Sequence, residues 1–381
     1  MINPGAFYKL LTENKFSFFS GVPDSLLKDI CAYITDNVEA GKHIIAANEG
    51  AAVALGTGYH LTTGEYPVVY MQNSGLGNAI NPLLSLTDAK VYSIPMLLII
   101  GWRGEPGVKD EPQHIKQGEI TTGLLDAMKI PYEILSQDLS QVEKQINICV
   151  NHLKSSSSPY AFVIQKNTFE SYKLKSTDEH STNNFLTRED AISKILSLTG
   201  ESDIIVSTTG MTSREVFEYR TRNSQTHGAD FLTVGSMGHA SQIALAIATD
   251  KKDRNIICLD GDGAVLMHMG SMAIIGQAQP ENYLHIVLNN AAHDSVGGQP
   301  TAGDNIDLPS IAKACGYKNA FTVTTEEEIS KKVNECRNKG LSLIEVKVKK
   351  GARKDLGRPT TTPIENKIEF MKHLKGEVKR Q

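Results

Sequence analysis

An aspartate and an asparagine in the second half of the chain have the residue types and the spacing of a metal site. Asp262 stands between Gly261 and Gly263 at the end of an apolar run, and Asn290 ends the next apolar run. Parallel strands one crossover apart place their carboxyl ends together, so we expect the two side chains to face a common point. Carboxylate and amide oxygens are ligands that Mg²⁺ accepts beside phosphate oxygens and water. The pattern therefore predicts a magnesium site next to a phosphate group.

The residues around Asp262 strengthen this interpretation. Glycines on both sides would let the backbone approach a phosphate, and a helix starting near Ala264 would offer it unpaired N–H groups. An isolated Gly-Asp-Gly would be a weak signal, because strand ends often carry these residues as turns. The double asparagine, Asn289-Asn290, after the following apolar run makes the pattern specific.

Such a site needs parallel strands to position it, and the chain alternates short β-rich runs with segments of helical period. We predict strands at Phe16–Ser20, His43–Ala47, Pro67–Gln72, Pro95–Gly101, Tyr132–Leu135, Tyr160–Gln165, Asp203–Ser207, Phe231–Gly235, Asn255–Asp260, Leu284–Asn290 and Leu341–Val348. This order is typical of an α/β fold, and near-continuous apolar strands suit sheets covered on both faces. The sequence predicts two doubly wound parallel-sheet domains.

The domain boundaries follow from changes in composition. Residues 170–186 are rich in polar residues, as a linker is, so we predict a first domain over 1–169 and a second over 187–348. Residues 349–381 hold ten Lys or Arg and four Asp or Glu, and we predict a basic C-terminal extension there.

Composition limits the classes of partner. The formal charge of −4 gives no general basic field for nucleic acid. The longest apolar run, Ile94–Ile100, is far shorter than the ~18–20 residues that cross a membrane, and residues 1–15 lack a signal-like apolar block. The five cysteines are odd in number and form no C-x-x-C pair, which favours buried thiols. We expect a cytoplasmic protein that binds a small molecule and neither nucleic acid nor a membrane.

The metal pattern resembles that of the thiamine-diphosphate-dependent decarboxylases. In that family the aspartate and the last asparagine hold the Mg²⁺ that anchors the cofactor's diphosphate, and a carbonyl two residues further on, here that of Ala292, completes the protein ligands. An isolated glutamate acts on the cofactor's pyrimidine ring, and the resemblance gives this role to Glu49 in Asn48-Glu49-Gly50. Taken alone, Glu49 would be an ordinary carboxylate at a helix N-terminus.

Other segments match those that surround the cofactor in the family. Met237 stands in place of the bulky residue that supports the bent cofactor, and the carbonyl of Gly235 in place of an acceptor for its 4′-amine. On periodicity alone, Met237 would fill the core. The cofactor-binding set that the resemblance implies is Gly210, Met211, Thr212, Gly235, Met237, Gly261, Asp262, Gly263, Ala264 and Asn290, with Asp262, Asn290 and Ala292 on the metal.

Four segments narrow the resemblance to the phosphonopyruvate decarboxylases, with the sulfopyruvate decarboxylases as near relatives; they are residues 21–25, 101–107, 209–215 and 294–299. The linker is too short for the middle domain of the larger thiamine decarboxylases. The resemblance implies decarboxylation of the 2-oxo acid 3-phosphonopyruvate to phosphonoacetaldehyde and CO₂ in phosphonate (2-aminoethylphosphonate) biosynthesis. Having both halves on one chain favours this substrate.

Three alternatives remain open. The chain could instead decarboxylate sulfopyruvate to sulfoacetaldehyde, or it could act as a 2-oxoacid carboligase. A relative that has lost its chemistry and serves as a binding partner is disfavoured by the intact Glu49, Asp262 and Asn290.

A phosphonate carries close to two negative charges, so its site requires fixed cations. We predict a Gly- and Pro-interrupted loop after an apolar strand that carries four candidate cations, Arg103, Lys109, His114 and Lys116, of which Arg103 is the strongest candidate. Each residue alone could equally be part of a solvated surface loop. In the basic extension, we hypothesise that 351–359 forms a lid that brings Arg353 and Arg358 to the substrate, with a solvated tail as the alternative.

Two further expectations concern proton transfer and assembly. Asp24 lies in the loop where related decarboxylases carry an acidic residue, so the resemblance makes it our candidate for the protonation that releases the product, although a helix N-cap is an equal alternative. In the family, the glutamate of one subunit reaches a cofactor held by its neighbour, so the resemblance implies a homodimer or a larger homo-oligomer.

Overall fold

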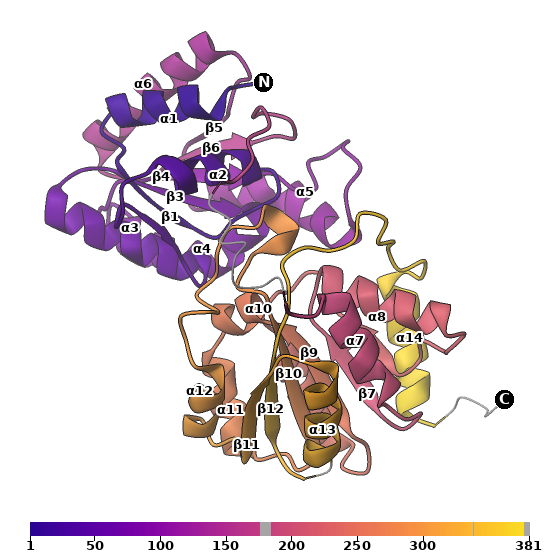
Figure 1. The fold of residues 1–381 in the computed structure, drawn as a ribbon. Helices are drawn as coiled ribbons and strands as arrows, with labels where there is room; N and C mark the ends of the chain where they lie inside the picture. The colour runs from indigo at the N-terminus through magenta and orange to yellow at the C-terminus, as the bar shows by residue number, and fades with distance from the viewer. Residues whose placement is uncertain (176–183, 338, 377–381) are drawn as a thin grey trace. The chain divides into compact units, whose positions relative to one another are not determined.

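The computed structural model describes residues 1–175, 184–337 and 339–376, and the chain divides into two compact α/β units (Figure 1). The first unit comprises Met1–Thr177 with Ser295–Gln299, and the second comprises Asp178–Asp294 with Pro300–Gln381. Residues 176–183, the middle of the linker that we predicted over 170–186, lie outside the described residues.

The first unit is built on a parallel sheet of six described strands in the order β2-β1-β3-β4-β6-β5. The strands are β1 (Phe18–Gly21), β2 (His43–Ile45), β3 (Pro67–Gln72), β4 (Leu97–Gly101), β5 (Tyr132–Ile134) and β6 (Tyr160–Ile164). The helices are α1 (Pro4–Glu13), α2 (Lys28–Asn37), α3 (Glu49–Thr63), α4 (Leu76–Pro82), α5 (Pro112–Ala127) and α6 (Leu139–Ser156), with short helical turns at η1 (Asn73–Gly75) and η2 (Leu83–Thr87).

Helices cover both faces of this sheet, and β4 shows why. Its residues are all buried, and they alternate between two cores. Leu97 and Ile99 pack with α1, α2 and α6, whereas Leu98 and Ile100 pack with α3, α4 and α5. An uninterrupted apolar strand is stable only in such a three-layer arrangement, because its side chains point alternately to the two faces of the sheet and both faces must be shielded from water.

The second unit repeats this architecture in the order β11-β12-β10-β9-β7-β8, again with six described parallel strands. The strands are β7 (Ile204–Ser207), β8 (Asp230–Leu232), β9 (Ile256–Gly261), β10 (Tyr283–Asn289), β11 (Asn319–Val323) and β12 (Ser342–Lys347). The helices are α7 (Arg188–Ser197), α8 (Met211–Arg222), α9 (Ala240–Asp250), α10 (Asp262–Met267), α11 (Gly270–Ala278), α12 (Leu308–Ala314), α13 (Glu326–Cys336) and α14 (Pro363–Leu374), with a short turn η3 (Asp294–Val296). The predicted fold class is confirmed.

One strand and one cysteine differ from what the sequence predicts. β11 is an edge strand whose residues are mostly half-buried, so it has no continuous apolar run. The cysteines are free thiols, but Cys315 is only half-buried whereas the other four are buried. Among the described residues, no helix has the length and apolar character needed to cross a membrane.

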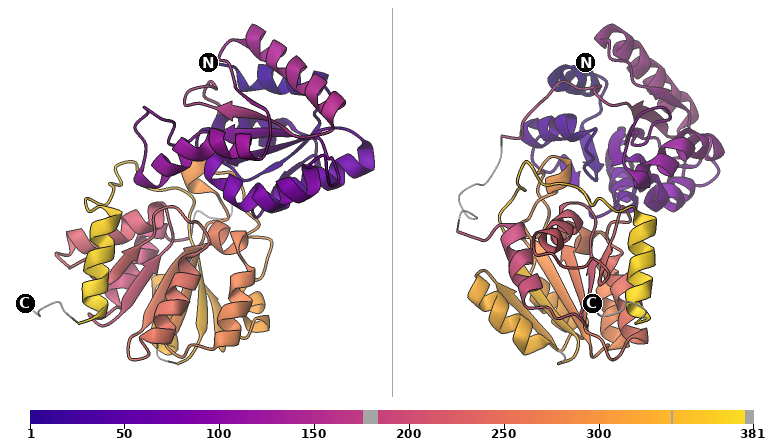
Figure 2. Two further views of the ribbon diagram at one scale, coloured as in Figure 1. Left: turned by 180° about the vertical axis from the view of Figure 1, so that it is seen from behind. Right: turned by 90° about the vertical axis from the view of Figure 1, so that its right-hand side faces the viewer.

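The helix α14, which belongs to the basic extension, packs along the edge strand β8 (Figure 2). The side chain of Asn366 completes the backbone hydrogen bonding of that strand. Its Oδ1 accepts from the N–H of Leu232 at 3.1 Å, and its Nδ2 donates to the carbonyl of Asp230 at 2.8 Å. This part of the extension is therefore a structural element of the second unit.

Candidate functional site

Asp262 and Asn290 lie side by side at the ends of two paired strands. In the parallel pair β9 and β10, Leu288 is the partner of Gly261, so the residues that follow leave the sheet at the same edge. Asp262 is 2% exposed and Asn290 is 6% exposed. The backbone N–H of Asn290 donates to the Asp262 carboxylate. Strand register thus brings together the two residues that the sequence singled out.

The Asp262 carboxylate is buried, and this changes its pKa. Burial raises the pKa of Asp262 to about 6, although the Thr301 hydroxyl and backbone N–H groups donate to the carboxylate and favour its charged form. A Cβ added to Gly303 would lie 2.7 Å from Asp262 Oδ2, so only glycine allows this close approach. A divalent cation would stabilise the buried charge more strongly than these neutral donors do.

The groups beside Asp262 fit Mg²⁺ and a phosphate. Asp262, the Asn290 amide and the Ala292 carbonyl are hard oxygen donors, which is the set that Mg²⁺ takes with phosphate and water. At the neighbouring strand β7, Gly210 has a φ of +88° and precedes α8, which no described side chain caps. A Cβ added to Gly210 or Gly261 would meet no described atom within 4 Å. The α8 N–H groups and this open space suit an anion.

Met237 lies over the start of α10, together with a histidine. A Cβ added to Gly263 would lie 3.4 Å from the Met237 methyl and 3.3 Å from His293 Cε1. Burial lowers the pKa of His293 to about 4, so its imidazole is neutral at physiological pH. Gly235 donates its N–H to Thr209 Oγ1 at 3.0 Å, which links its turn to the segment before α8.

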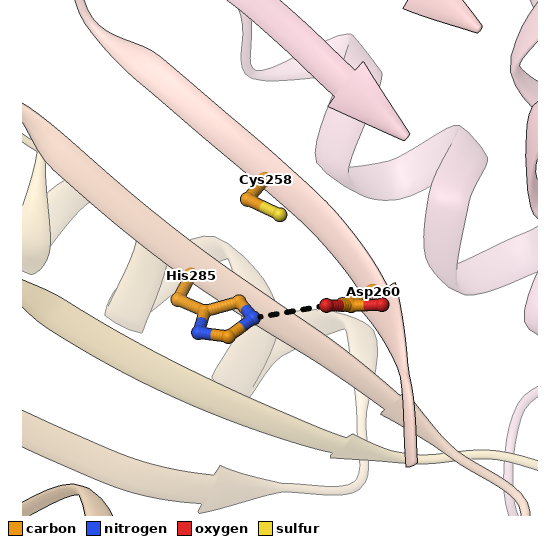
Figure 3. Close-up of side chains that lie close together, drawn as sticks. All are labelled: Cys258, Asp260 and His285. Atoms are coloured by element: carbon orange, nitrogen blue, oxygen red, sulfur yellow. Dashed lines mark ion pairs between the residues drawn. The ribbon is translucent and has the colours of Figure 1, made fainter. Parts of the chain in front are cut away.

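Three polar side chains lie in the core behind this edge (Figure 3). Cys258 and Asp260 project from β9, and His285 from β10, with donor atoms within 4.8 Å of one another. Asp260 Oδ2 is 3.5 Å from His285 Nε2, and Asp260 Oδ1 accepts from the N–H of Gly261 at 3.0 Å. The pair therefore supports the turn that leads to Asp262.

Glu49 occupies a separate, buried position in the first unit. It begins α3, is 5% exposed and accepts a hydrogen bond from Asn78 Nδ2 at 2.7 Å. A Cβ added to Gly75 would lie 2.5 Å from Glu49 Oε1, so glycine is required there. The Asn48 side chain caps the helix by accepting from the N–H of Ala51. Asn78 and Gly75 were not among the predicted site residues, because the segment after β3 carries no recognised motif.

A cavity of about 220 Å³ lies at the carboxyl edge of the first sheet, where residues following β1, β4 and β6 meet. Its described lining residues are Ser25, Leu26, Trp102, Arg103, Gly104, Glu105, Val108, Lys109, Asp110 and Lys166. They include three cations and two carboxylates. The cavity therefore combines a confined volume with one more cation than carboxylate.

Arg103 is held rigidly in this cavity. Its Nη1 donates to Ser25 Oγ at 2.7 Å, and its Nε donates to Asp110 Oδ2 at 2.8 Å, with Nη2 donating to the other carboxylate oxygen. Burial alone would raise the pKa of Asp110, but the hydrogen bonds from Arg103 and from backbone N–H groups hold it below its usual value. Asp110 thus orients Arg103 while offsetting part of its charge.

The other predicted cations have different places. Lys109 lines the cavity, as does Lys166, which the sequence analysis missed because it follows β6, far from Arg103 in the chain. His114 and Lys116 lie in α5 and are outside the described lining. His114 is buried, whereas Lys116 is exposed and pairs with Glu119 at 2.9 Å.

Asp24 is completely buried beside the cavity. Burial raises the pKa of Asp24 to about 6, outweighing the hydrogen bond from the N–H of Leu26 and the nearby charge of Arg103. A Cβ added to Gly101 would lie 2.0 Å from Asp24 Oδ1. The helix N-cap alternative does not describe Asp24, because α2 begins after Leu27 and no described side chain caps it.

Arg353 of the basic extension is held by carboxylates of the second unit. Its Nε donates to Glu189 of α7 at 2.9 Å, its Nη1 lies 3.0 Å from Asp355, and its Nη2 contacts Glu218 of α8. Its charge is thus already compensated on the surface of α7 and α8. Arg358 is exposed.

Both units match thiamine enzymes in sequence. The family described as "Thiamine pyrophosphate enzyme, N-terminal TPP binding domain" matches residues 5–129, and the "C-terminal TPP binding domain" of the same enzymes matches residues 208–346.

Three full-length or partial relatives are similar to the chain. Phosphonopyruvate decarboxylase of Streptomyces viridochromogenes is 33% identical over 360 residues, covering 91% of this chain and 88% of the relative. Sulfopyruvate decarboxylase of Methanosarcina acetivorans is 26% identical over 367 residues, covering 90% of each. The sulfopyruvate decarboxylase subunit beta of Methanocaldococcus jannaschii is 40% identical over 154 residues, covering 40% of this chain and 77% of the subunit. Because the Methanosarcina relative matches both halves on one chain, the single chain does not by itself favour phosphonopyruvate.

The raised pKa of Asp24 predicts a pH-dependent cost to stability. The folded state binds this proton more tightly than the unfolded state, so the cost appears as the pH rises from about 4 through about 6. Asp24→Asn removes it, and we expect the variant's gain in free energy of unfolding to be up to about 3 kcal/mol larger at about pH 7 than at about pH 4. Urea denaturation at both pH values measures this. The exposed Asp126→Asn is the control, and equal gains for Asp24→Asn at both pH values would contradict the assignment.

Proposed function

The chain belongs to the thiamine pyrophosphate enzyme family, and we propose that it decarboxylates 3-phosphonopyruvate to phosphonoacetaldehyde and CO₂, as a carboxy-lyase of phosphonate biosynthesis. The observation that carries the choice of substrate is the cation-lined cavity of the first unit. The match to a phosphonopyruvate decarboxylase over 91% of the chain supports the same choice.

The cofactor is thiamine diphosphate, which when bound supplies the electron sink for the pair left behind as CO₂ departs. We propose that Asp262, Asn290 and the Ala292 carbonyl hold Mg²⁺. The α8 N-terminus at 210–212 and the turn at 261–264 would bind the diphosphate, and Gly235 and Met237 would hold the rings. The buried carboxylate and the open space beside Gly210 and Gly261 support this assignment.

Two carboxyl groups of the first unit handle protons in this proposal. Glu49 would exchange a proton with the cofactor's pyrimidine ring, and the hydrogen bond from Asn78 fixes its carboxylate. Burial raises the pKa of Asp24 to about 6, so this carboxyl keeps its proton to a higher pH than an exposed aspartate does. It would supply that proton to the carbon from which CO₂ departs, so that a new C–H bond replaces the broken C–C bond.

The cavity cations bind the phosphonate. One cation at 4 Å contributes up to about 4 kcal/mol before desolvation at an effective dielectric of 20. Arg103, Lys109 and Lys166 supply this attraction, and Glu105 and Asp110 offset part of it, which leaves one positive charge in excess for the phosphonate. Sulfopyruvate is the second candidate, favoured by the match to sulfopyruvate decarboxylases, but its sulfonate carries one charge and gains less from these cations.

We predict that kcat/KM falls in the order phosphonopyruvate, sulfopyruvate, pyruvate. Lys166→Met should lower kcat/KM for phosphonopyruvate about 10–100-fold, the range for a lost charge-assisted hydrogen bond, with little effect on pyruvate. Steady-state kinetics with the three 2-oxo acids measures this, and Lys154→Met on the exposed surface of α6 is the control. Equal kcat/KM for phosphonopyruvate and pyruvate would refute the assignment of the cavity, and a preference for sulfopyruvate would select the second candidate.

Glu49→Gln should retain thiamine diphosphate but lose proton exchange at its C2 atom, with kcat lowered about 10²–10⁴-fold, because the amide cannot exchange the proton. Hydrogen–deuterium exchange of the bound cofactor, followed by NMR after quenching, measures the first effect. Asp262→Ala provides the contrast, since it should lose cofactor binding itself. Normal exchange in Glu49→Gln would show that another group activates the cofactor.

We also propose a homodimer or larger homo-oligomer in which Glu49 of one copy acts on cofactor held by Asp262 of another. Mixing the inactive variants Glu49→Gln and Asp262→Ala should then restore activity, because a mixed dimer contains one site with both native residues. Sedimentation of the wild-type protein gives the mass in parallel. A fully active monomer, or mixtures that exchange subunits yet stay inactive, would contradict this.

A further inference from the structure

One carboxylate in the second unit joins three segments that are far apart in the chain. Asp294 Oδ2 accepts from Asn290 Nδ2 at 2.6 Å, from Arg188 Nη1 at 3.1 Å and from the backbone N–H of Gly351 at 2.9 Å. The first donor is the proposed metal ligand, the second begins α7, and the third follows β12. Asp294 therefore connects the metal site to the basic extension.

The position of Asp294 is fixed by the buried side chain of Arg188. Arg188 is buried and donates to Glu215 through Nε at 2.8 Å and Nη2 at 3.0 Å. Its remaining nitrogen, Nη1, reaches Asp294. A guanidinium held at both carboxylates has little freedom to rotate, because its donors form a rigid planar fork.

This arrangement helps to set which end of the Asn290 side chain is available to a metal. An asparagine amide has one oxygen and one nitrogen, and only the oxygen can ligate Mg²⁺. The Asp294 carboxylate accepts but does not donate, so it holds Nδ2 of Asn290 and places Oδ1 on the other side. There Oδ1 accepts from the N–H of Ala292 at 3.1 Å and has a second lone pair that a metal could use. Partners of this kind orient metal ligands in many sites.

The basic extension supplies the third contact through a short segment, residues 351–357, which we call the C-terminal strap. Arg353 anchors the strap to Glu189 of α7 and Glu218 of α8, and the N–H of Gly357 also donates to Glu218. These anchors hold the N–H of Gly351 against Asp294. The contacts of the strap thus lead to the metal ligand, and the charge of Arg353 is taken up by carboxylates.

We propose that Asp294 is a positioning residue for Asn290, and that the C-terminal strap acts through it to set the affinity of the site for Mg²⁺ and so the retention of the cofactor. The proposal rests on the proposed function only in taking Asn290 as a metal ligand. It assigns the strap to cofactor retention, in place of the substrate lid that the sequence suggested.

The test measures thiamine diphosphate binding by calorimetry as a function of Mg²⁺ concentration, with no substrate present. Asp294→Ala should raise the Mg²⁺ concentration at half-saturation about 10–100-fold, the usual effect of losing such a partner. Arg353→Gln should raise it about threefold to fivefold, as the loss of partly exposed ion pairs allows. Arg353→Lys should recover part of this effect. Lys354→Gln, an equal charge change at an exposed neighbour, should leave it unchanged.

Excess Mg²⁺ should restore wild-type cofactor binding in Arg353→Gln, a recovery that general destabilisation would not show. Should Asp294→Ala fail to fold, Arg353→Gln decides the question. An unchanged Mg²⁺ dependence in Arg353→Gln overturns the proposal, and so does a raised KM for the substrate without any Mg²⁺ effect, which is the signature of a lid. If the chain binds the cofactor with the predicted Mg²⁺ shifts but releases no CO₂ from phosphonopyruvate, the proposed function fails while this inference stands.

Discussion

Burial of ionisable side chains at the carboxyl ends of parallel strands is the constraint on which both candidate sites depend. A carboxylate that leaves water loses its hydration, and its charge must then be stabilised by N–H groups, cations or a metal. At Asp262, the surrounding hydroxyl and N–H donors leave the pKa raised to about 6. The register of β9 with β10 places this carboxylate beside Asn290, and the lack of a side chain at Gly303 leaves room for it.

In the first unit, two carboxyl groups near Arg103 have pKa values shifted in opposite directions. Asp110 receives Arg103 and two backbone N–H groups, so it stays charged and holds the guanidinium in place. Asp24 lies deeper and receives less compensation, so it keeps its proton to a higher pH. Two carboxyl groups near one arginine thus have pKa values shifted in opposite directions, because the hydrogen bonds to Asp110 outweigh its burial whereas those to Asp24 do not.

The sequence was sufficient wherever local pattern and chain direction determine the outcome. Apolar runs marked the buried strands, and parallel pairing alone placed Asp262 near Asn290. The edge strand β11 was not predicted, because it is only half-buried and lacks a continuous apolar run. His114 and Lys116 were predicted in a loop but lie in the helix α5, whose first turn contains Pro112, a residue that commonly starts helices. Lys116 is exposed on this helix. Lys166 reaches its cavity through contacts between distant segments that no local pattern encodes.

The hydrogen bonds of Asn366 have a consequence for solubility. An edge strand presents unpaired N–H and C=O groups that can recruit a strand of another molecule, and proteins protect such edges by covering them. β8 is an edge strand, and α14 lies along it with one amide side chain acting as a substitute strand at Leu232 and Asp230. By covering β8, the helix α14 of the basic extension opposes edge-to-edge pairing with other molecules. Shortening the chain before α14 would expose that edge, so a loss of soluble protein in such a truncation would report on β8 and not on catalysis.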